Sequence, residues 1–345
     1  MDYSAAVMAA DHAQNALAAE FWDAGDVIFR HRLPHDRSER FSYWWQAHAI
    51  DALLDGYLRT KDPAYMELIQ KELKGTIAHN GGTILNNWYD DMEWMALALL
   101  RLWDETKEET YKKRVDILWK DIKTAWNDEM GGGLAWRKNQ LDYKNTPANA
   151  PAAILAFRLY ERFGNQDDLN WGKKIFEWNR LNLMDPDTFY VWDGMNRTGD
   201  GTIDYDWAFT YNQGVMIGAA VEYYRITGDK AQLVLAKNIA YESKRRFGDL
   251  SGGVFPYEGK DDCGLFRGIF FRYLAELIKE APEETELYGL LLVNAKSIAQ
   301  KGMSDTGVIG GYWDVKPGES VDLAQHLSGI MVLEMAARML KNKEP

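Results

Sequence analysis

The chain alternates between two kinds of helical segment, and this alternation restricts its fold more than any other feature. One kind is apolar nearly all round, which indicates a helix enclosed on both sides. The segments of this kind are residues 44–58, 92–103, 151–160, 215–224, 265–278 and 327–340. The other kind, as in residues 111–122 and 231–240, is amphipathic, which is typical of a helix with one solvated face.

Short turns join each enclosed segment to the next amphipathic one. They carry helix-capping chemistry, as in Gly164-Asn165 and Gly228-Asp229. The repeat recurs every ~45 to 65 residues, longer than tetratricopeptide repeats, which favours a closed ring over an open solenoid. With a helix over residues 5–30 as the first outer member, the pattern predicts six inner and six outer helices. We therefore expect an all-α (α/α)6 barrel that forms one domain over residues 1–345.

The connections from outer to inner helices are long and rich in glycine and aromatic residues. They span residues 127–147, 182–211, 249–263 and 302–322. Three contain a related Gly-Gly core that predicts a short β-hairpin, at residues 131–136, 252–257 and 310–313. Because long loops on one rim of a rigid scaffold usually carry function, we expect the site on this rim.

Composition excludes several classes of function. The chain has 52 acidic and 40 basic residues and a net charge of -12, which argues against a nucleic-acid-binding surface. No apolar stretch approaches the roughly 20 residues of a membrane helix. The single cysteine, Cys263, excludes an internal disulfide framework, and no ligand cluster has metal spacing, so we expect neither metal nor cofactor. We expect the protein to be a monomer. We also expect it in the cytoplasm, because residues 1–4 lack a signal-peptide pattern; if a leader has been removed from this sequence, the protein would instead be secreted.

Two adjacent carboxylates, Asp90 and Asp91, precede the apolar run that starts at Met92. Acids in a first helical turn cap free N–H groups and complement the helix dipole. A pair of carboxyl groups is also what glycosidic bond cleavage generally requires, one as nucleophile and one as acid and then base. Spacing alone leaves both interpretations open.

The starts of the inner helices and the long loops offer a ring of polar and aromatic side chains. Aromatic faces stack on sugar rings, while amides and carboxylates pair with hydroxyls, so this set favours a carbohydrate ligand. Each member also has a structural interpretation, as a core group, a helix cap or an ion-pair partner. The predicted substrate-binding residues are Trp45, Trp88, Tyr89, Trp136, Asn145, Asn149, Asp204, Tyr211, Asn212, Gln213, Arg267 and His326.

An ordered set of motifs resembles glycoside hydrolase family 76. The motifs are residues 88–98, 132–136, 144–150, 211–214 and 266–270, and the resemblance covers roughly residues 10 to 340. It implies an (α/α)6 barrel and a retaining hydrolase that cleaves α-1,6-mannosidic bonds in α-mannan or mannooligosaccharides. It also implies that Asp90 is the nucleophile and Asp91 the general acid/base.

Two other functions stay open from the sequence. A sugar 2-epimerase on an α/α barrel would transfer protons through histidine, and His48 and His326 are the histidines on predicted inner helices. A non-catalytic carbohydrate-binding protein would explain the aromatic ring equally well, but it would leave the paired carboxylates without a role.

Overall fold

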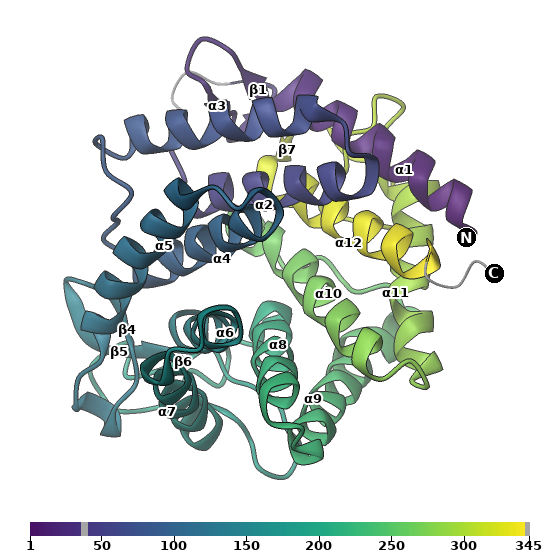
Figure 1. Ribbon diagram of the computed structural model, residues 1–345. Helices are drawn as coiled ribbons and strands as arrows, with labels where there is room; N and C mark the ends of the chain where they lie inside the picture. The colour runs from purple at the N-terminus through teal and green to yellow at the C-terminus, as the bar shows by residue number, and fades with distance from the viewer. Residues whose placement is uncertain (36–40, 342–345) are drawn as a thin grey trace. The chain divides into compact units, whose positions relative to one another are not determined.

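The computed structural model describes residues 1–35 and 41–341. These residues form twelve α-helices, connected by short strands and by single turns of 3-10 and π-helix (Figure 1). Contacts divide the chain into two compact units, Met1–Thr83 with Lys244–Pro345, and Ile84–Ser243. The single domain expected from the sequence stays a prediction.

The unit Ile84–Ser243 alternates enclosed and outer helices as predicted. Helix α6 packs between α4 and α8, and each of these three packs against the outer helix that follows it (Figure 1). In α6, 13 of 18 residues are buried, against 5 of 14 in α5, which separates the enclosed class from the outer class. The enclosed helices are α4 (Tyr89–Thr106), α6 (Thr146–Phe163) and α8 (Thr210–Thr227), and the outer helices are α5 (Glu109–Ile122), α7 (Gln166–Leu183) and α9 (Lys230–Ser243).

A small antiparallel sheet lies at the start of α6. It is ordered β4 (Ala135–Arg137), β5 (Gln140–Asn145) and β6 (Gly194–Met195). Lys144 pairs with Ala135 on one side and Met195 on the other. The turns η2 (Lys123–Ala125) and η3 (Glu129–Gly131) lead into it. The sheet confirms the hairpin predicted near residues 131–136, and because β4 and β5 contact α6 it places loop side chains beside the helix starts.

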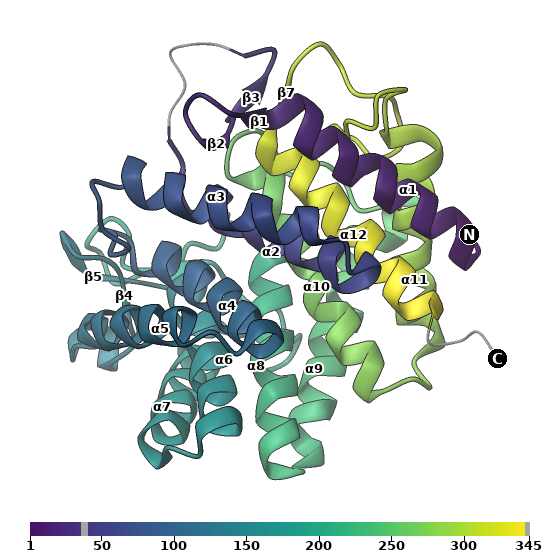
Figure 2. The ribbon, with the colours of Figure 1, turned by 45° about the horizontal axis from the view of Figure 1, so that its top comes forward.

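The other unit repeats the same arrangement. Helix α12 packs against α1, α2, α10 and α11, and α2 packs against α3. Strands β3 and β7 pair at the N-terminal end of α12, as Figure 2 shows. The helices are α1 (Tyr3–Ala16), α2 (Tyr43–Thr60), α3 (Pro63–His79), α10 (Cys263–Glu280), α11 (Thr285–Ser297) and α12 (Leu323–Lys341). The short elements are η1 (Leu17–Phe21), β1 (Trp22–Asp23), β2 (Ile28–Phe29), β3 (Arg32–Leu33), η4 (Lys244–Gly248), η5 (Asp249–Ser251), η6 (Ile298–Gly302) and β7 (Val321–Asp322).

The helix predicted over residues 5–30 ends earlier than expected. It continues through η1 only to Phe21, and the chain then forms the antiparallel pair β1 and β2. The Asp23 carboxylate accepts the backbone N–H groups of Gly25 and Asp26, at 2.9 and 3.2 Å, which stabilises a turn instead of a further helical turn. The prediction of a helix to residue 30 was therefore wrong.

Two of the three predicted hairpins are also wrong, since within the described chain residues 252–257 and 310–313 form no strand. Side chains take the hydrogen bonds that a partner strand would have supplied. The Asn294 amide accepts from the Phe255 N–H at 2.9 Å and donates to the Gly253 carbonyl at 2.8 Å. Arg267 donates to the carbonyls of Phe255 and Gly311.

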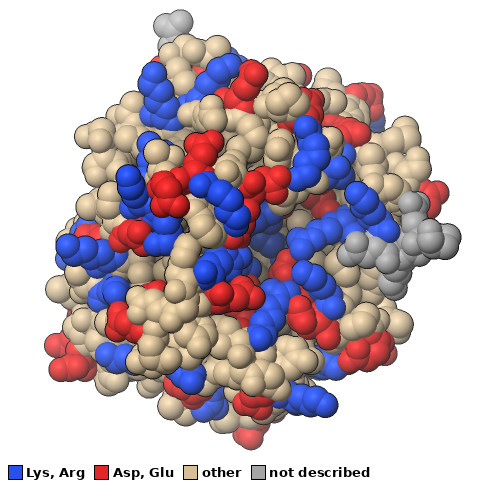
Figure 3. Space-filling view, viewed as in Figure 1, with Lys and Arg blue, Asp and Glu red and all other residues tan. Residues whose placement is uncertain are grey.

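Searched over its described helices, the chain has none that is long and apolar enough to cross a membrane. On the face shown in Figure 3, basic and acidic side chains are interspersed rather than segregated by sign.

Candidate active site

The two adjacent aspartates lie in the first turn of the enclosed helix α4. The helix begins at Tyr89, so Asp90 and Asp91 are its second and third residues, and both are partly buried. Oδ1 of Asp90 accepts the backbone N–H of Asp91 at 3.0 Å. One oxygen of Asp90 therefore makes the bond to its own helix that a capping acid would make.

The second oxygen of Asp90 is held from outside the helix. The indole Nε1 of Trp136 on β4 donates to Oδ2 of Asp90 at 3.0 Å. Strand β4 is fixed to the segment before α4, because Arg137 bridges to Trp88 and the Lys138 N–H donates to the Asn87 carbonyl at 2.9 Å. Two N–H donors to one carboxylate favour its ionised form and fix its direction, which suits a nucleophile.

Asp193, just before β6, is a buried hydrogen-bond acceptor close to this pair. It accepts from the Tyr143 hydroxyl at 3.1 Å, the Tyr211 hydroxyl at 2.9 Å and the Asn212 amide at 3.1 Å. Burial raises the pKa of Asp193, and these three hydrogen bonds oppose that shift. Burial also raises the pKa of Tyr143 and of Tyr211, so both phenols stay protonated and remain donors. The charge of Asp90 adds to the shift in the pKa of Tyr211, which places Tyr211 within its electrostatic reach.

Asp204 lies beside this cluster in the loop after β6. Its Oδ1 accepts from Arg197 Nε at 3.0 Å, and its backbone N–H donates to the Gly194 carbonyl at 2.9 Å. Its Oδ2 is buried and has no hydrogen-bond partner among the residues that the structure describes. The guanidinium of Arg197 lies 4.4 Å from the centre of the exposed Trp207 ring. Asp204, Arg197 and Trp207 thus place polar and aromatic side chains next to the Asp193 cluster.

Glu93, one turn after Asp90, is a buried acid that the sequence analysis did not single out. It is inaccessible to solvent, and burial, followed by the charge of Asp90, raises its pKa well above the usual value. This shift favours the neutral form of Glu93 and so opposes a second negative charge beneath Asp90. Its position inside an apolar run was the available signal. For Tyr143 no such signal existed, because its role depends on the register between β5 and β6.

Two predicted substrate-binding amides have a structural role instead. Asn149 accepts from the Leu134 N–H at 2.8 Å and donates to the Leu134 carbonyl at 3.0 Å. Gln213 makes the same pair of bonds to Val191, at 2.9 and 2.6 Å. Both residues are inaccessible to solvent, and each is the fourth residue of its enclosed helix. These amides hold the preceding loops, so their side chains are not placed to contact a ligand.

Three further predicted residues, all in the unit that contains both termini, are also buried in its scaffold. Trp45 stacks on His31 at 3.9 Å between ring centroids and donates to Asp262. His326 accepts from the Ile309 N–H at 3.1 Å, and its other ring nitrogen lies 3.1 Å from the Ala13 carbonyl. These side chains are therefore engaged within the scaffold, and their contact with a substrate stays a prediction.

Arg267, the third of these, is inaccessible to solvent and lies 3.8 Å from the centre of the Trp313 ring. Burial lowers its pKa to about 10. Because its two terminal nitrogens donate to loop carbonyls, it connects two loops rather than presenting a charge to a ligand.

The other predicted residues, Trp88, Tyr89, Asn145, Tyr211 and Asn212, belong to the same unit as the aspartate pair. Trp88 is 37% exposed and directly precedes α4, which suits a stacking surface. Tyr89 is buried, and Asn145 is the N-cap of α6. Among the described residues no group of three or more His, Cys, Asp or Glu side chains is arranged to hold a metal ion.

The structure thus combines alternating enclosed and outer helices with a carboxylate pair at the start of an enclosed helix. A model described as glycosyl hydrolase family 76 matches residues 5–345, and the chain belongs to this family of glycoside hydrolases. The resemblance stated from the sequence is therefore confirmed.

Solved structures and one curated relative extend this comparison. The Lin0763 protein from Listeria innocua is 38% identical, with a TM-score of 0.93 over 100% of this chain and 99% of that one. An α-1,6-mannanase from Salegentibacter sp. is 36% identical, with a TM-score of 0.92 over 96% of this chain and 99% of that one. A mannan endo-1,6-α-mannosidase from Saccharomyces cerevisiae is 25% identical over 84% of this chain and 71% of its own length. The predicted (α/α)6 barrel is confirmed by the likeness to family structures.

Proposed function

We propose that this enzyme hydrolyses α-1,6-mannosidic bonds with retention of the anomeric configuration. The observation that carries the proposal is the carboxylate pair at the start of α4, with both oxygens of Asp90 held by N–H donors. Family membership and the 36% identity to an α-1,6-mannanase support the choice of bond.

In this proposal Asp90 is the nucleophile and Asp91 the general acid/base. The Asp90 carboxylate attacks the anomeric carbon while Asp91 donates its proton to the departing glycosidic oxygen, which leaves a mannosyl ester on Asp90. Asp91 then takes a proton from a water molecule that attacks the same carbon and releases Asp90. Two inversions at one carbon give net retention.

One solved relative supports the pair in particular. An inactive variant of the Salegentibacter enzyme, with two consecutive aspartates replaced by asparagine, was solved with α-1,6-mannotriose. It is 35% identical to this chain, with a TM-score of 0.91 over 96% of this chain and 99% of that one. We infer that Asp90 and Asp91, which are consecutive aspartates at the start of an enclosed helix, are likewise required for activity.

The surroundings of the pair suit a neutral sugar. Trp88 offers an exposed ring, and the partly exposed Asp204 offers a carboxylate for hydroxyl groups. Tyr211, whose hydroxyl donates to Asp193, lies within reach of the charge on Asp90. We propose these three as the substrate-binding residues within this unit.

A 2-epimerase receives no support from the two histidines that it would need. Burial lowers the pKa of His48 and of His326 to about 3. Both imidazoles are therefore neutral near pH 7, and neither can supply a proton as imidazolium.

The test is hydrolysis of α-1,6-mannotetraose followed by proton NMR. The first product should be the α-anomer, and Asp90→Asn and Asp91→Asn should each lose at least about 1,000-fold in kcat/KM. Asp167→Asn is the matched control, because Asp167 is likewise the second residue of its helix, α7, beside a second aspartate. A β-anomer as first product would exclude retention, and full activity of Asp90→Asn would exclude the assigned nucleophile.

A further inference from the structure

The Trp136 indole is oriented toward Asp90 rather than left free as a stacking surface. Its Nε1 donates to Oδ2 of Asp90 at 3.0 Å, and the Arg137 guanidinium lies 4.7 Å from the centre of its ring. The Tyr143 ring packs against the indole in a T-shaped arrangement, with 84° between planes and 5.7 Å between centroids. The N–H group and the ring of the indole are therefore both engaged within the protein.

Tyr143 is itself held in place by burial and by a hydrogen bond to Asp193. It is 2% exposed, and its hydroxyl donates to Asp193 at 3.1 Å. Asp193 is fixed in turn, because its backbone carbonyl accepts the Thr146 N–H at 2.7 Å, where β5 leads into α6. The fit is close, since a Cβ added at Gly194 would lie 2.6 Å from the Tyr143 hydroxyl oxygen.

These contacts form a continuous line from the sheet to the reactive carboxylate. Asp193 holds Tyr143 by a hydrogen bond, Tyr143 packs against Trp136, and Trp136 bonds to Asp90. A carboxylate that attacks carbon needs one defined direction, and an N–H donor from a fixed side chain sets that direction while favouring the ionised form.

We infer that Trp136 and Tyr143 are positioning residues for the nucleophile: Trp136 orients the Asp90 carboxylate through its indole N–H, and Tyr143, anchored on Asp193, holds the indole in place. The inference rests on the proposed role of Asp90 as nucleophile. It assigns Trp136 a role different from the stacking surface expected from the sequence.

The test compares Trp136→Phe, which removes the N–H and keeps a ring, with Tyr143→Phe, which removes only the hydroxyl. On the α-1,6-mannooligosaccharide that the wild type cleaves, Trp136→Phe should lower kcat about 10- to 100-fold while KM changes less than about threefold. Tyr143→Phe should lower kcat about 3- to 10-fold. The acidic limb of the kcat/KM profile should move to higher pH in both variants, because the ionised form of Asp90 loses support.

Three controls separate positioning from other roles. Tyr111→Phe removes a buried phenol from the outer helix α5 and should leave kcat and the pH profile unchanged. If Tyr143 acts through Trp136, the double variant should lose no more than Trp136→Phe alone. Melting temperatures show whether each variant folds. If Trp136→Phe does not fold, the inference is tested on Tyr143→Phe alone.

A second measurement is independent of turnover. In protein labelled with ¹³C at the aspartate carboxyl carbons, the Asp90 signal, identified by its loss in Asp90→Asn, should titrate at higher pH in Trp136→Phe than in wild type. A wild type that cleaves no α-1,6-mannoside would overturn the proposed function and leave this titration to decide the positioning role. An unchanged Asp90 titration, a large rise in KM with unchanged kcat, or full additivity in the double variant would overturn the inference.

Discussion

The indole Nε1 of Trp119 lies 2.8 Å from Oδ1 of Asp168, the third residue of the outer helix α7. The same kind of bond joins Trp136 to Asp90, the second residue of the enclosed helix α4. Both helices start with two adjacent aspartates, and in both an indole from a different segment donates to one of them. An Asp-Asp helix start with an indole partner therefore occurs in both an enclosed and an outer helix. In the proposed function, the enclosed position of α4 distinguishes the catalytic pair from the pair on α7.

We expect Asp168→Ala to affect stability and not activity. Trp119 is 4% exposed, so loss of its acceptor leaves a buried N–H without a partner, which costs roughly 1–3 kcal/mol. Urea denaturation should show this loss, while kcat and KM of the folded variant stay at wild-type values. Asp167→Ala is the control, because Asp167 is exposed and its contact with Lys123 should contribute less than about 1 kcal/mol. A fall in kcat of Asp168→Ala would contradict the layer argument.

The enclosed helices were predictable because a helix without a polar face has to be covered on both sides. Their starts lie earlier than the apolar runs indicate, at Tyr89 rather than residue 92 and at Thr146 rather than residue 151. The first turns carry polar residues, since they form the rim. Hydropathy alone therefore misplaces these helix starts by about one turn.

The site was predictable only in part, because a polar residue in an apolar helix can face a ligand or a backbone group. Asp90 and Asn149 look alike in this respect from the sequence. The Asn149 amide is hydrogen-bonded to both backbone groups of Leu134, while the Asp90 carboxylate accepts the indole N–H of Trp136. Whether such a side chain faces a ligand or a backbone group depends on the path of the preceding loop. The hydrophobic periodicity of the sequence does not encode that path.

Asn149→Leu should reduce both stability and activity. It leaves the N–H and carbonyl of Leu134 unpaired, at roughly 2–5 kcal/mol for the two buried groups. Leu134 directly precedes β4, so Trp136 should lose its alignment with Asp90, and kcat should fall about tenfold or more in the folded variant.

Asn294→Leu is the matched control for this prediction. Asn294 makes the same bonds to the loop at Gly253 and Phe255, and like Asn149 it also donates to the carbonyl four residues earlier. Its stability loss should be similar, with kcat of the folded variant unchanged. Equal kcat losses in the two variants would show that the effect of Asn149 is not specific to β4.

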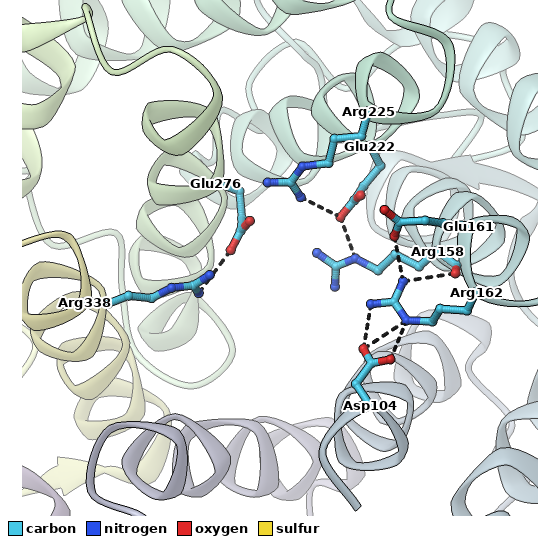
Figure 4. Close-up of polar contacts among 8 residues, drawn as sticks. All are labelled: Asp104, Arg158, Glu161, Arg162, Glu222, Arg225, Glu276 and Arg338. Atoms are coloured by element: carbon cyan, nitrogen blue, oxygen red, sulfur yellow. Dashed lines mark hydrogen bonds and ion pairs between the residues drawn. The ribbon is translucent and has the colours of Figure 1, made fainter. Parts of the chain in front are cut away.

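The ends of α6 and α8 carry an ion-pair cluster remote from the first turns of these helices (Figure 4). Glu222 accepts from Arg158 at 2.6 Å and from Arg225 at 3.3 Å, and its side chain is 6% exposed. Glu222→Ala should cost about 3–5 kcal/mol, because it removes a buried carboxylate that two partly buried guanidinium groups share. Glu161→Ala is the control, since Glu161 is 51% exposed and should change stability by less than about 1 kcal/mol. Chemical denaturation of both variants measures the difference, and equal losses would contradict it.

Trp88→Ala should weaken substrate binding more than chemistry. The ring is 37% exposed and directly precedes the first turn of α4. Stacking on a sugar contributes roughly 0.5–1.5 kcal/mol beyond area burial, so KM should rise about threefold to tenfold with kcat nearly unchanged. Steady-state kinetics on mannotetraose measures both constants. A loss confined to kcat would instead assign Trp88 to the alignment of the pair.

Buried Glu72 on α3 should make stability fall as pH rises. Burial raises its pKa to about 8, although the Thr76 hydroxyl donates to it at 2.9 Å. A carboxyl group whose pKa is raised on folding contributes stability that is fully present below its unfolded value of about 4.5 and is lost as pH rises toward 8. Between these limits the contribution should decline by about 1.4 kcal/mol per pH unit.

Glu72→Gln keeps the shape of the side chain and removes its titration. The free energy of unfolding, measured by urea at intervals from pH 5 to pH 8, should therefore decline less steeply in the variant than in wild type. Glu93 has the same sign of shift and remains in both proteins, so the difference between the two curves isolates Glu72. Glu67→Gln on the same helix should leave the wild-type curve unchanged. Parallel curves for wild type and Glu72→Gln would show that Glu72 is already ionised in the folded protein.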